Sequence, residues 1–133
     1  MLQILTKHGQ LDVAIYVTET FGRFQRKERI GDPALRQAIE RAEAGLVDAD
    51  LGGGLIKQRV ARAGQGRRGG YRTLIAFRAG GRAVFLYGFA KSAQSNIDAA
   101  TLSHWQAIGA DLLAASDPAI GVALADNELK EVS

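Results

Sequence analysis

The chain of 133 residues contains no cysteine, only two histidines and no long hydrophobic run. Without cysteine, disulfides, thiolate nucleophiles and thiolate-bound metals are excluded. His8 and His104 have no neighbours at metal-ligand spacing, so a zinc site is not expected. The first residues of the chain lack the basic and apolar regions of a signal peptide. No segment comes close to the run of about 18 apolar residues that a membrane-spanning helix needs. We therefore expect a cytoplasmic protein with no metal or other cofactor and no contact with a membrane.

Acidic residues are missing from one stretch, Leu51–Ile97, which has nine basic residues and no Asp or Glu. The rest of the chain has eight basic and fourteen acidic residues, so a net charge of +3 conceals a segment at +9 beside a remainder at −6. Clustered Lys and Arg without interleaved carboxylates are typical of a site for a polyanion. The basic residues are Lys57, Arg59, Arg62, Arg67, Arg68, Arg72, Arg78, Arg82 and Lys91.

The first part of the chain predicts a strand followed by two helices. Val13–Thr18 is β-branched and aromatic, as in a strand, and Thr20–Arg29 has the pattern of a short amphipathic helix. The Asp32-Pro33 pair predicts the start of a longer helix, with Asp32 as the N-cap and Gly45 as the stop. We interpret the glycine-rich DADLGGG that follows as a turn.

A three-stranded meander over Leu55–Phe89 forms the centre of the expected fold. Its first strand places Lys57 and Arg59 on one face, and its last strand is expected to place Phe85, Tyr87 and Phe89 together. A helix with an apolar stripe between Leu102 and Leu113 should then lie across the sheet. The predicted fold is α+β, with two N-terminal helices and a later helix on a small, largely antiparallel sheet and the basic surface on the opposite side. Residues 1–12 are expected to form a short arm or strand, and residues 13–133 a single domain. Near the end of this domain, we expect a helix over Asp117–Ala125 and then an edge strand or a frayed tail over Asn127–Val132.

The chemistry that remains is that of cations and tyrosines. Lys and Arg hold a phosphate and stabilise a pentacovalent dianion, and a tuned Lys or Tyr moves a proton. RNA supplies its own nucleophile, the 2′-hydroxyl, so this inventory suits RNA cleavage better than DNA hydrolysis. From composition alone, nucleic-acid binding without catalysis is favoured over RNA cleavage. We assign RNA binding to residues of the meander and its glycine-rich loop: Arg62, Arg67, Arg68, Tyr71 and Arg82.

Several runs of residues together resemble the RelE/HigB superfamily of toxins from type II toxin-antitoxin modules. These runs are LGGGL, KQRVAR, GQGRRGGYRTL and FLYGFAKS, and the resemblance extends over about Val13–Val132. It implies a RelE-like fold and a cytoplasmic endoribonuclease, an mRNA interferase that cuts messenger RNA in the ribosomal A site without a metal and so inhibits translation. It also implies a cognate antitoxin, often a helix-turn-helix repressor, that neutralises the toxin.

The resemblance also implies which residues form the catalytic site. The family's basic residues fall on Lys57, Arg59, Arg72 and Lys91. The family uses a tyrosine of its final segment in catalysis, but no Tyr follows Lys91 here, so that role falls to Tyr87 or another group. The antitoxin is expected either to cover Lys57, Arg59 and Arg72 or to block ribosome entry sterically. Two other functions stay open: a noncatalytic RNA-binding or regulatory module, and a ParE-like toxin that acts on DNA gyrase.

Overall fold

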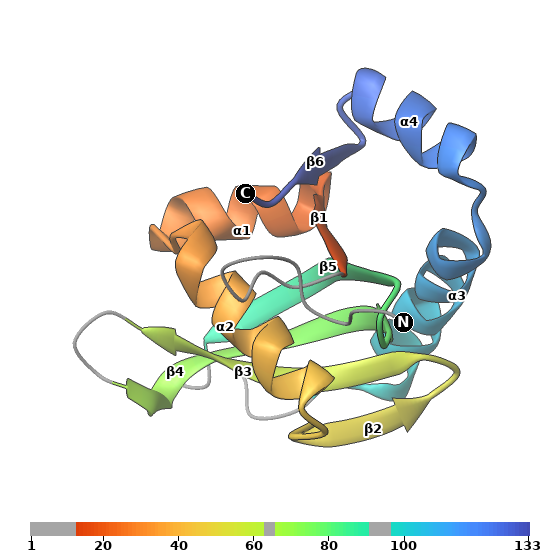
Figure 1. Ribbon diagram of the computed structural model, residues 1–133. Helices are drawn as coiled ribbons and strands as arrows, with labels where there is room; N and C mark the ends of the chain where they lie inside the picture. Colours follow the sequence, from red (N-terminus) through yellow and green to blue (C-terminus); the bar gives the residue numbers. More distant parts are fainter. Residues whose placement is uncertain (1–12, 63–65, 91–96) are drawn as a thin grey trace, which may run out of the picture.

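A six-stranded sheet is the centre of the molecule in the computed structural model, which describes residues 13–62, 66–90 and 97–133. The strands are β1 (Ala14–Thr18), β2 (Ala49–Gly52), β3 (Leu55–Arg62), β4 (Gly66–Arg78), β5 (Arg82–Ala90) and β6 (Leu129–Glu131). The helices are α1 (Glu19–Glu28), α2 (Asp32–Glu43), α3 (Ala99–Ala114) and α4 (Asp117–Ala125). The strands lie in the order β2-β3-β4-β5-β1-β6, and among these pairs only β1 and β5 are parallel. The predicted α+β class and the largely antiparallel sheet are confirmed (Figure 1).

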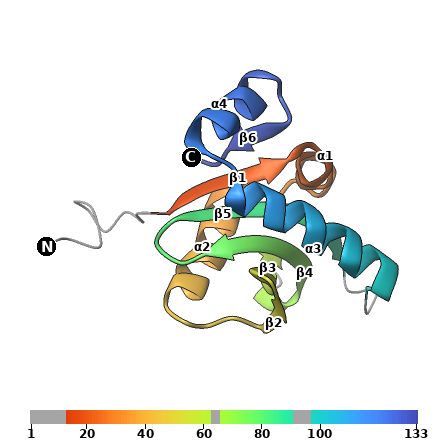
Figure 2. The same ribbon diagram turned by 90° about the vertical axis from the view of Figure 1, so that its right-hand side faces the viewer.

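Helices cover both faces of this sheet. Helices α1 and α2 pack on one face, called the α1–α2 face below, whereas α3 packs on the other, the α3 face (Figures 1 and 2). The side chains of Lys57, Arg59 and Arg72 lie on the α3 face. The expectation that the basic surface would oppose all the helices is therefore correct for α1 and α2 and wrong for α3. Alternation along a strand determines which side chains share a face but does not tell which face a later helix will cover.

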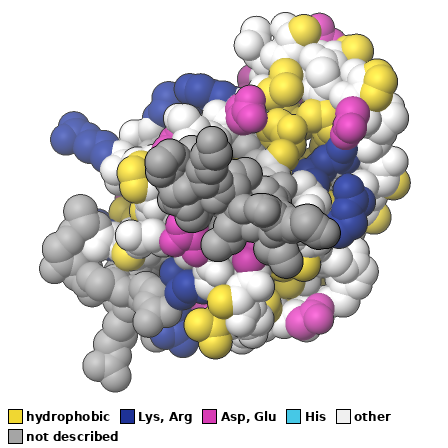
Figure 3. Space-filling view, in the orientation of Figure 1, with side chains coloured by type: hydrophobic (Ala, Val, Ile, Leu, Met, Phe, Trp, Pro, Cys, Tyr) yellow, Lys and Arg dark blue, Asp and Glu magenta, His cyan; other side chains and the backbone are white. Residues whose placement is uncertain are grey.

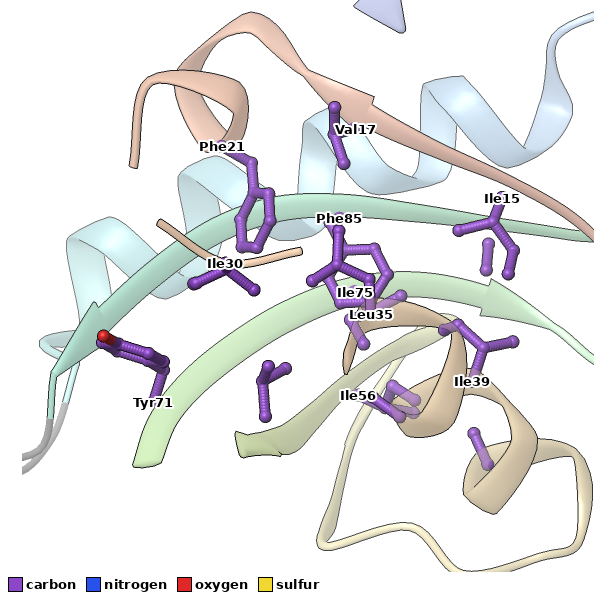
Figure 4. Close-up of a cluster of buried hydrophobic side chains, with 14 of the residues drawn as sticks. Ile15, Val17, Phe21, Ile30, Leu35, Ile39, Ile56, Tyr71, Ile75 and Phe85 are labelled. Atoms are coloured by element: carbon purple, nitrogen blue, oxygen red, sulfur yellow. The ribbon is translucent and has the colours of Figure 1, made fainter. Parts of the chain in front are cut away.

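The core of the α1–α2 face is aromatic and aliphatic. Phe21, Leu35, Ile39, Ile75 and Phe85 are fully buried there, as the close-up in Figure 4 shows. The rings of Phe21 and Phe85 lie 5.1 Å apart between centroids. Burial of side chains of this size stabilises a fold by about 1.5–3 kcal/mol each, so this layer fixes α1 and α2 on the sheet.

Gly88 of β5 allows α1 to approach this closely. A Cβ atom at this position would lie 2.6 Å from Cε2 of Phe24 and 3.0 Å from Cε1 of Phe21. Because real Cβ atoms do not approach this near, the absence of a side chain at Gly88 is a packing requirement.

The α3 face has its own core, centred on α3. Trp105 of α3 packs among Leu74, Val84 and Leu86 of the central strands. The predicted apolar stripe of this helix and its place across the sheet are confirmed (Figure 2). No single helix in the described part of the chain is long and apolar enough to span a membrane; α3 and α4 reach the required length only as a pair, bent by 115°.

Three local features differ from the sequence prediction. The N-cap of α2 is Gly31, and Asp32 is the first helical residue, so its carboxylate is free to bind elsewhere. The DADLGGG run is not only a turn, because β2 pairs with β3 from Ala49 to Gly52. A bulge interrupts the pairing of β4 with β5, since Leu74 pairs with Tyr87 but Ile75 pairs with Phe85. The bulge sends Phe85 to the α1–α2 face and Tyr87 to the α3 face, so the expected shared face of Phe85, Tyr87 and Phe89 is wrong for Phe85.

The C-terminal residues complete the sheet. Strand β6 pairs with β1 through Thr18 and Leu129, which confirms the predicted edge strand. The backbone N–H and the hydroxyl of Ser133 both donate to Oδ2 of Asp32, at 3.1 Å. Burial works to raise the pKa of the Asp32 carboxyl, but hydrogen bonds from Ser133 and Gln25 outweigh it and hold that pKa below its usual value.

Candidate active site

The basic residues meet in two rows that run across the three central strands on the α3 face. In one row, Arg59 of β3 lies opposite Arg72 of β4, and Arg72 lies opposite Phe89 of β5. In the next row Lys57 lies opposite Leu74, which lies opposite Tyr87. Directly opposed residues on one face have Cβ atoms about 5 Å apart and diagonal neighbours about 7–8 Å apart. Arg72 therefore has Arg59 beside it and Lys57 and Tyr87 at its diagonals.

These cations are not neutralised by carboxylates. Among residues 13–62, 66–90 and 97–133, Arg23 pairs with Glu19 and Arg82 with Asp117, and neither ion pair involves Lys57, Arg59 or Arg72. Like charges directly opposite each other on a sheet are destabilising, so the pairing of Arg59 with Arg72 costs stability in the isolated protein. An anion bound between them would remove this cost.

Arg72 has a buried donor that the fold does not satisfy. Its Nη1 is the one buried side-chain nitrogen or oxygen in the described part of the chain that has no hydrogen-bond partner. A buried donor without a partner costs free energy and calls for an explanation, of which a missing ligand is one. The side chain of Arg72 as a whole is half-buried, and a guanidinium is a donor that suits a phosphate oxygen.

An aromatic wall borders the cations on the β5 side. The ring of Tyr87 stacks on that of Trp105 at 5.7 Å with an interplanar angle of 28°, and Phe89 lies 6.1 Å from Tyr87. Tyr87 is half-buried, so part of its side chain stays exposed to solvent. Trp105 was predicted only as a core residue; its role in holding the Tyr87 ring depends on the path of α3 over β5.

Side chains from outside the sheet support the strand that carries Lys57 and Arg59. Gln58 lies between them, points to the opposite face and is fully buried. Its amide donates to the carbonyls of Ala38 and Leu46, both at 3.0 Å. Beyond the end of the β2 pairing, Oδ2 of Asp48 accepts the N–H of Arg59 at 2.7 Å, and Arg41 donates to the Arg59 carbonyl. The loop before β2 therefore replaces a strand partner at Arg59 and holds the two cations in place.

Comparison with known families identifies the family of the chain. The model that describes the RelE toxin of the RelE/RelB toxin-antitoxin system matches residues 13–132. The chain belongs to the RelE toxin family. A search of curated proteins gave no match. For a RelE-family toxin a cognate antitoxin is the implied partner, and the match spans both the basic meander and the two C-terminal elements α4 and β6.

The sequence predicted ten site residues, and the structure brings four of them together: Lys57, Arg59, Arg72 and Tyr87. Lys91 lies outside the described residues, as do the side chains of Arg67 and Arg68 at the start of β4. Arg62 and Tyr71 lie on the α1–α2 face, with the Arg62 guanidinium 5.6 Å from the centre of the Tyr71 ring. Alternation along the strand could have shown that Tyr71 and Arg72 do not share a face, because adjacent residues point to opposite faces of a strand.

Tyr71 is held by the fold. It is 3% exposed, and its hydroxyl donates to Oε1 of Glu28 at 3.0 Å. Burial, together with this hydrogen bond and the charge of Glu28, raises the pKa of Tyr71 above its ordinary value. Tyr71 therefore remains a protonated structural residue at neutral pH, and of the two tyrosines only Tyr87 reaches the cationic rows.

Arg82 has a structural role in place of the predicted RNA contact. Its side chain is 6% exposed, and Nη1 donates to the carbonyls of Leu112 and Ala115 at 2.7 and 2.9 Å. Its Nη2 donates to Asp117 at 3.0 Å. Arg82 thus satisfies the carbonyls at the end of α3 and joins that helix to α4, so its charge is directed into the protein.

Proposed function

We propose that this RelE-family toxin is a ribosome-dependent endoribonuclease that cleaves mRNA without a bound metal and so inhibits translation in the cytoplasm. The observation that carries the proposal is the Arg72 guanidinium, half-buried, opposite Arg59 and with Nη1 unpartnered in the described structure. A phosphodiester placed there would have donors on two sides before any bond is broken. Preorganised donors of this kind are the largest single contribution in many enzymes.

The reaction that suits these groups is an internal transfer in RNA. The 2′-hydroxyl oxygen attacks the adjacent phosphorus while the bond from phosphorus to the 5′-oxygen breaks. The 2′-hydroxyl proton is lost to a base, and the leaving 5′-oxygen takes up a proton. The products are a 2′,3′-cyclic phosphate and a 5′-hydroxyl, so no water is consumed in this step. Lys57, Arg59 and Arg72 offset the charge that grows on the phosphate oxygens, and Tyr87 is the candidate for a proton transfer.

In this proposal the ribosome aligns the reacting atoms of the messenger. The cations of the site offset the charge of a phosphate, but cations alone do not align the 2′-oxygen, phosphorus and 5′-oxygen. In-line alignment is worth several orders of magnitude in rate. A messenger held in the ribosomal A site would supply that alignment, and the toxin would then contribute the charges.

The test uses purified ribosomes stalled on a defined messenger in buffer that keeps the Mg²⁺ ribosomes need. We expect cleavage on ribosomes, none on the free messenger, and product ends carrying a cyclic phosphate and a 5′-hydroxyl. Replacing the 2′-hydroxyl by hydrogen at the cleaved nucleotide should abolish the cut. As a matched control, Arg23→Gln removes an exposed charge from α1 and should leave the rate unchanged.

Other outcomes identify the other candidate functions. Ends with a 5′-phosphate would show attack by an activated water and refute the internal transfer. Binding to RNA with no cleavage on any ribosome would favour a noncatalytic RNA-binding module. Growth arrest with DNA damage and intact messages would favour a toxin that acts on gyrase.

A further inference from the structure

A hollow on the α1–α2 face lies apart from the cationic rows. It has a volume of about 740 Å³ and is bordered by the end of α1, the start of α2 and the ends of β3 and β4. Its cations are Lys27, Arg29 and Arg62, and its apolar lining comes from Ile30, Ala34 and Ala61. Its position on the other face follows from strand pairing: Val60 pairs with Tyr71 at the hollow, and the adjacent pair, Arg59 with Arg72, points the opposite way. We call it the Arg29 hollow.

The backbone of Arg29 points to a function for its side chain. Arg29 ends α1 with φ 58° and ψ 46°, the left-handed conformation, and the N–H of Ile30 then donates to the carbonyl of Gln25 at 2.9 Å. Helices that end in this way usually place glycine at this position, because a side chain costs about 1–2 kcal/mol there. Apart from Asn127, the other described residues with positive φ are all glycines. The chain therefore accepts strain at one helix end and retains an exposed guanidinium there.

The charges around the hollow favour an anionic occupant. Lys27, Arg29 and Arg62 have no ion-pair partner among the described residues, and Arg62 is held only over the Tyr71 ring. Figure 3, which views the α1–α2 face, shows Lys and Arg side chains gathered over α1. The neighbouring groove between α1 and β6 shares Arg29 with the hollow, and its other charged lining residues are Arg26 and Lys130 together with Asp32 and Glu131. Arg29 thus lies where the two depressions meet, and the hollow itself has three cations and one carboxylate that the proposed cleavage does not use.

The composition of the hollow favours a peptide over RNA. The Glu28 carboxylate lines the wall, where it accepts the Tyr71 hydroxyl, and it would repel the continuous phosphates of a nucleic acid. A peptide, by contrast, brings separate carboxylates for Arg29 and Lys27 and apolar side chains for Ile30, Ala34 and Ala61. Arginine pairs with a carboxylate through two parallel hydrogen bonds, which suits a discrete acidic residue.

We propose that the Arg29 hollow docks an acidic segment of the cognate antitoxin. The antitoxin is then anchored on the face opposite Lys57, Arg59 and Arg72 and inhibits by preventing ribosome entry, not by covering the cations. This inference rests on the toxin-antitoxin part of the proposed function and is independent of the cleavage chemistry. One consequence is that the toxin in the complex still presents its cationic rows to small anions.

The test uses the full chain and, as the probe, the protein encoded by the gene beside its own. Arg29→Gly removes the guanidinium and also the strain, so its melting temperature should equal or exceed that of the wild type. We expect its affinity for the probe to fall at least about tenfold, the loss of one charge-assisted contact, with a weaker dependence on salt. Two controls should stay within about twofold of the wild type: Arg23→Gln on α1 outside the hollow, and the double variant Lys57→Ala with Arg59→Ala.

Several outcomes would overturn the docking site. The proposal is wrong if Arg29→Gly binds the probe as the wild type does, if Arg23→Gln loses as much, if the double variant loses more, or if no complex forms. Reduced affinity of Arg29→Gly for ribosomes with unchanged affinity for the probe would make the hollow an RNA contact. If the chain fails to cleave any message but Arg29→Gly still loses the probe, the nuclease proposal fails and the docking site stands.

Discussion

Replacing Arg72 by methionine should separate stability from activity, because the guanidinium is unfavourable in the free fold. Methionine keeps most of the unbranched stem and its packing but removes the charge. The buried Nη1 has no partner among the described groups, and a donor in this condition costs about 1–3 kcal/mol. Repulsion from Arg59 directly across the ladder adds about 0.2–1 kcal/mol. Since Arg72 is only half-buried, solvent reduces both values.

We therefore expect the free energy of unfolding of Arg72→Met to rise by about 1 kcal/mol, which for a domain of this size is a gain of roughly 3–5 °C in Tm. The single-turnover rate on the ribosome should fall by two to three orders of magnitude, or about 2.7–4 kcal/mol in the barrier. Urea unfolding and single-turnover cleavage measure the two effects. The matched variant Arg59→Met, which has no buried unpartnered atom, should change stability by less than about 0.5 kcal/mol. A loss of more than 1 kcal/mol in Arg72→Met would mean that the guanidinium has a partner within the fold and would refute this reasoning.

Three further predictions concern the frame around the site. Arg82→Met should lower the free energy of unfolding by about 2–4 kcal/mol, because buried carbonyls at the end of α3 lose their donor, and should leave RNA affinity unchanged; a loss of RNA affinity in the folded variant would restore the RNA contact expected from the sequence. Gly88→Ala should cost about 1–3 kcal/mol in urea unfolding because the new methyl group meets the Phe24 ring, and a neutral result would show that α1 shifts freely. The pKa of Asp32 is lowered in the folded protein, so its ionised form stabilises the fold above the unfolded-state pKa, and this contribution is lost as the pH falls below about 4. Asp32→Asn should therefore be less stable than the wild type at pH 6 and equally stable in acid. A difference in stability that does not change with pH would contradict this role of the Asp32 carboxylate.

The sequence predicted the elements well because their signals are local. Alternation in β3 separated Lys57 and Arg59 from the core, and the stripe on α3 predicted its buried side. The four residues of β2 contain an Asp and a terminal Gly, so no alternation marks them as a strand. The bulge opposite Leu74 also has no local signal, although it decides that Tyr87 joins the cations.

Two of the predicted RNA contacts, Arg82 and Tyr71, show where local reasoning ends. Arg82 belongs to the basic run in sequence, yet its acceptors are thirty or more positions later, at the end of a helix. Tyr71 depends on Glu28, 43 positions earlier. A count of charge along the chain cannot distinguish a cation that faces solvent from one that donates hydrogen bonds to the end of a helix. Burial and hydrogen-bond partners make that distinction.

The pairing of β6 with β1 has a consequence for how the protein forms. Asp32 binds Ser133 across 101 positions, whereas β3, β4 and β5 pair with their neighbours in sequence. Local contacts form early and distant ones late, and a chain emerges from its N-terminus. The strands that carry Lys57 and Arg72 are therefore complete while the outer edge of β1 still lacks its partner. We therefore expect the outer edge of β1 to stay open until β6 pairs with it, and an open sheet edge is able to pair with another chain.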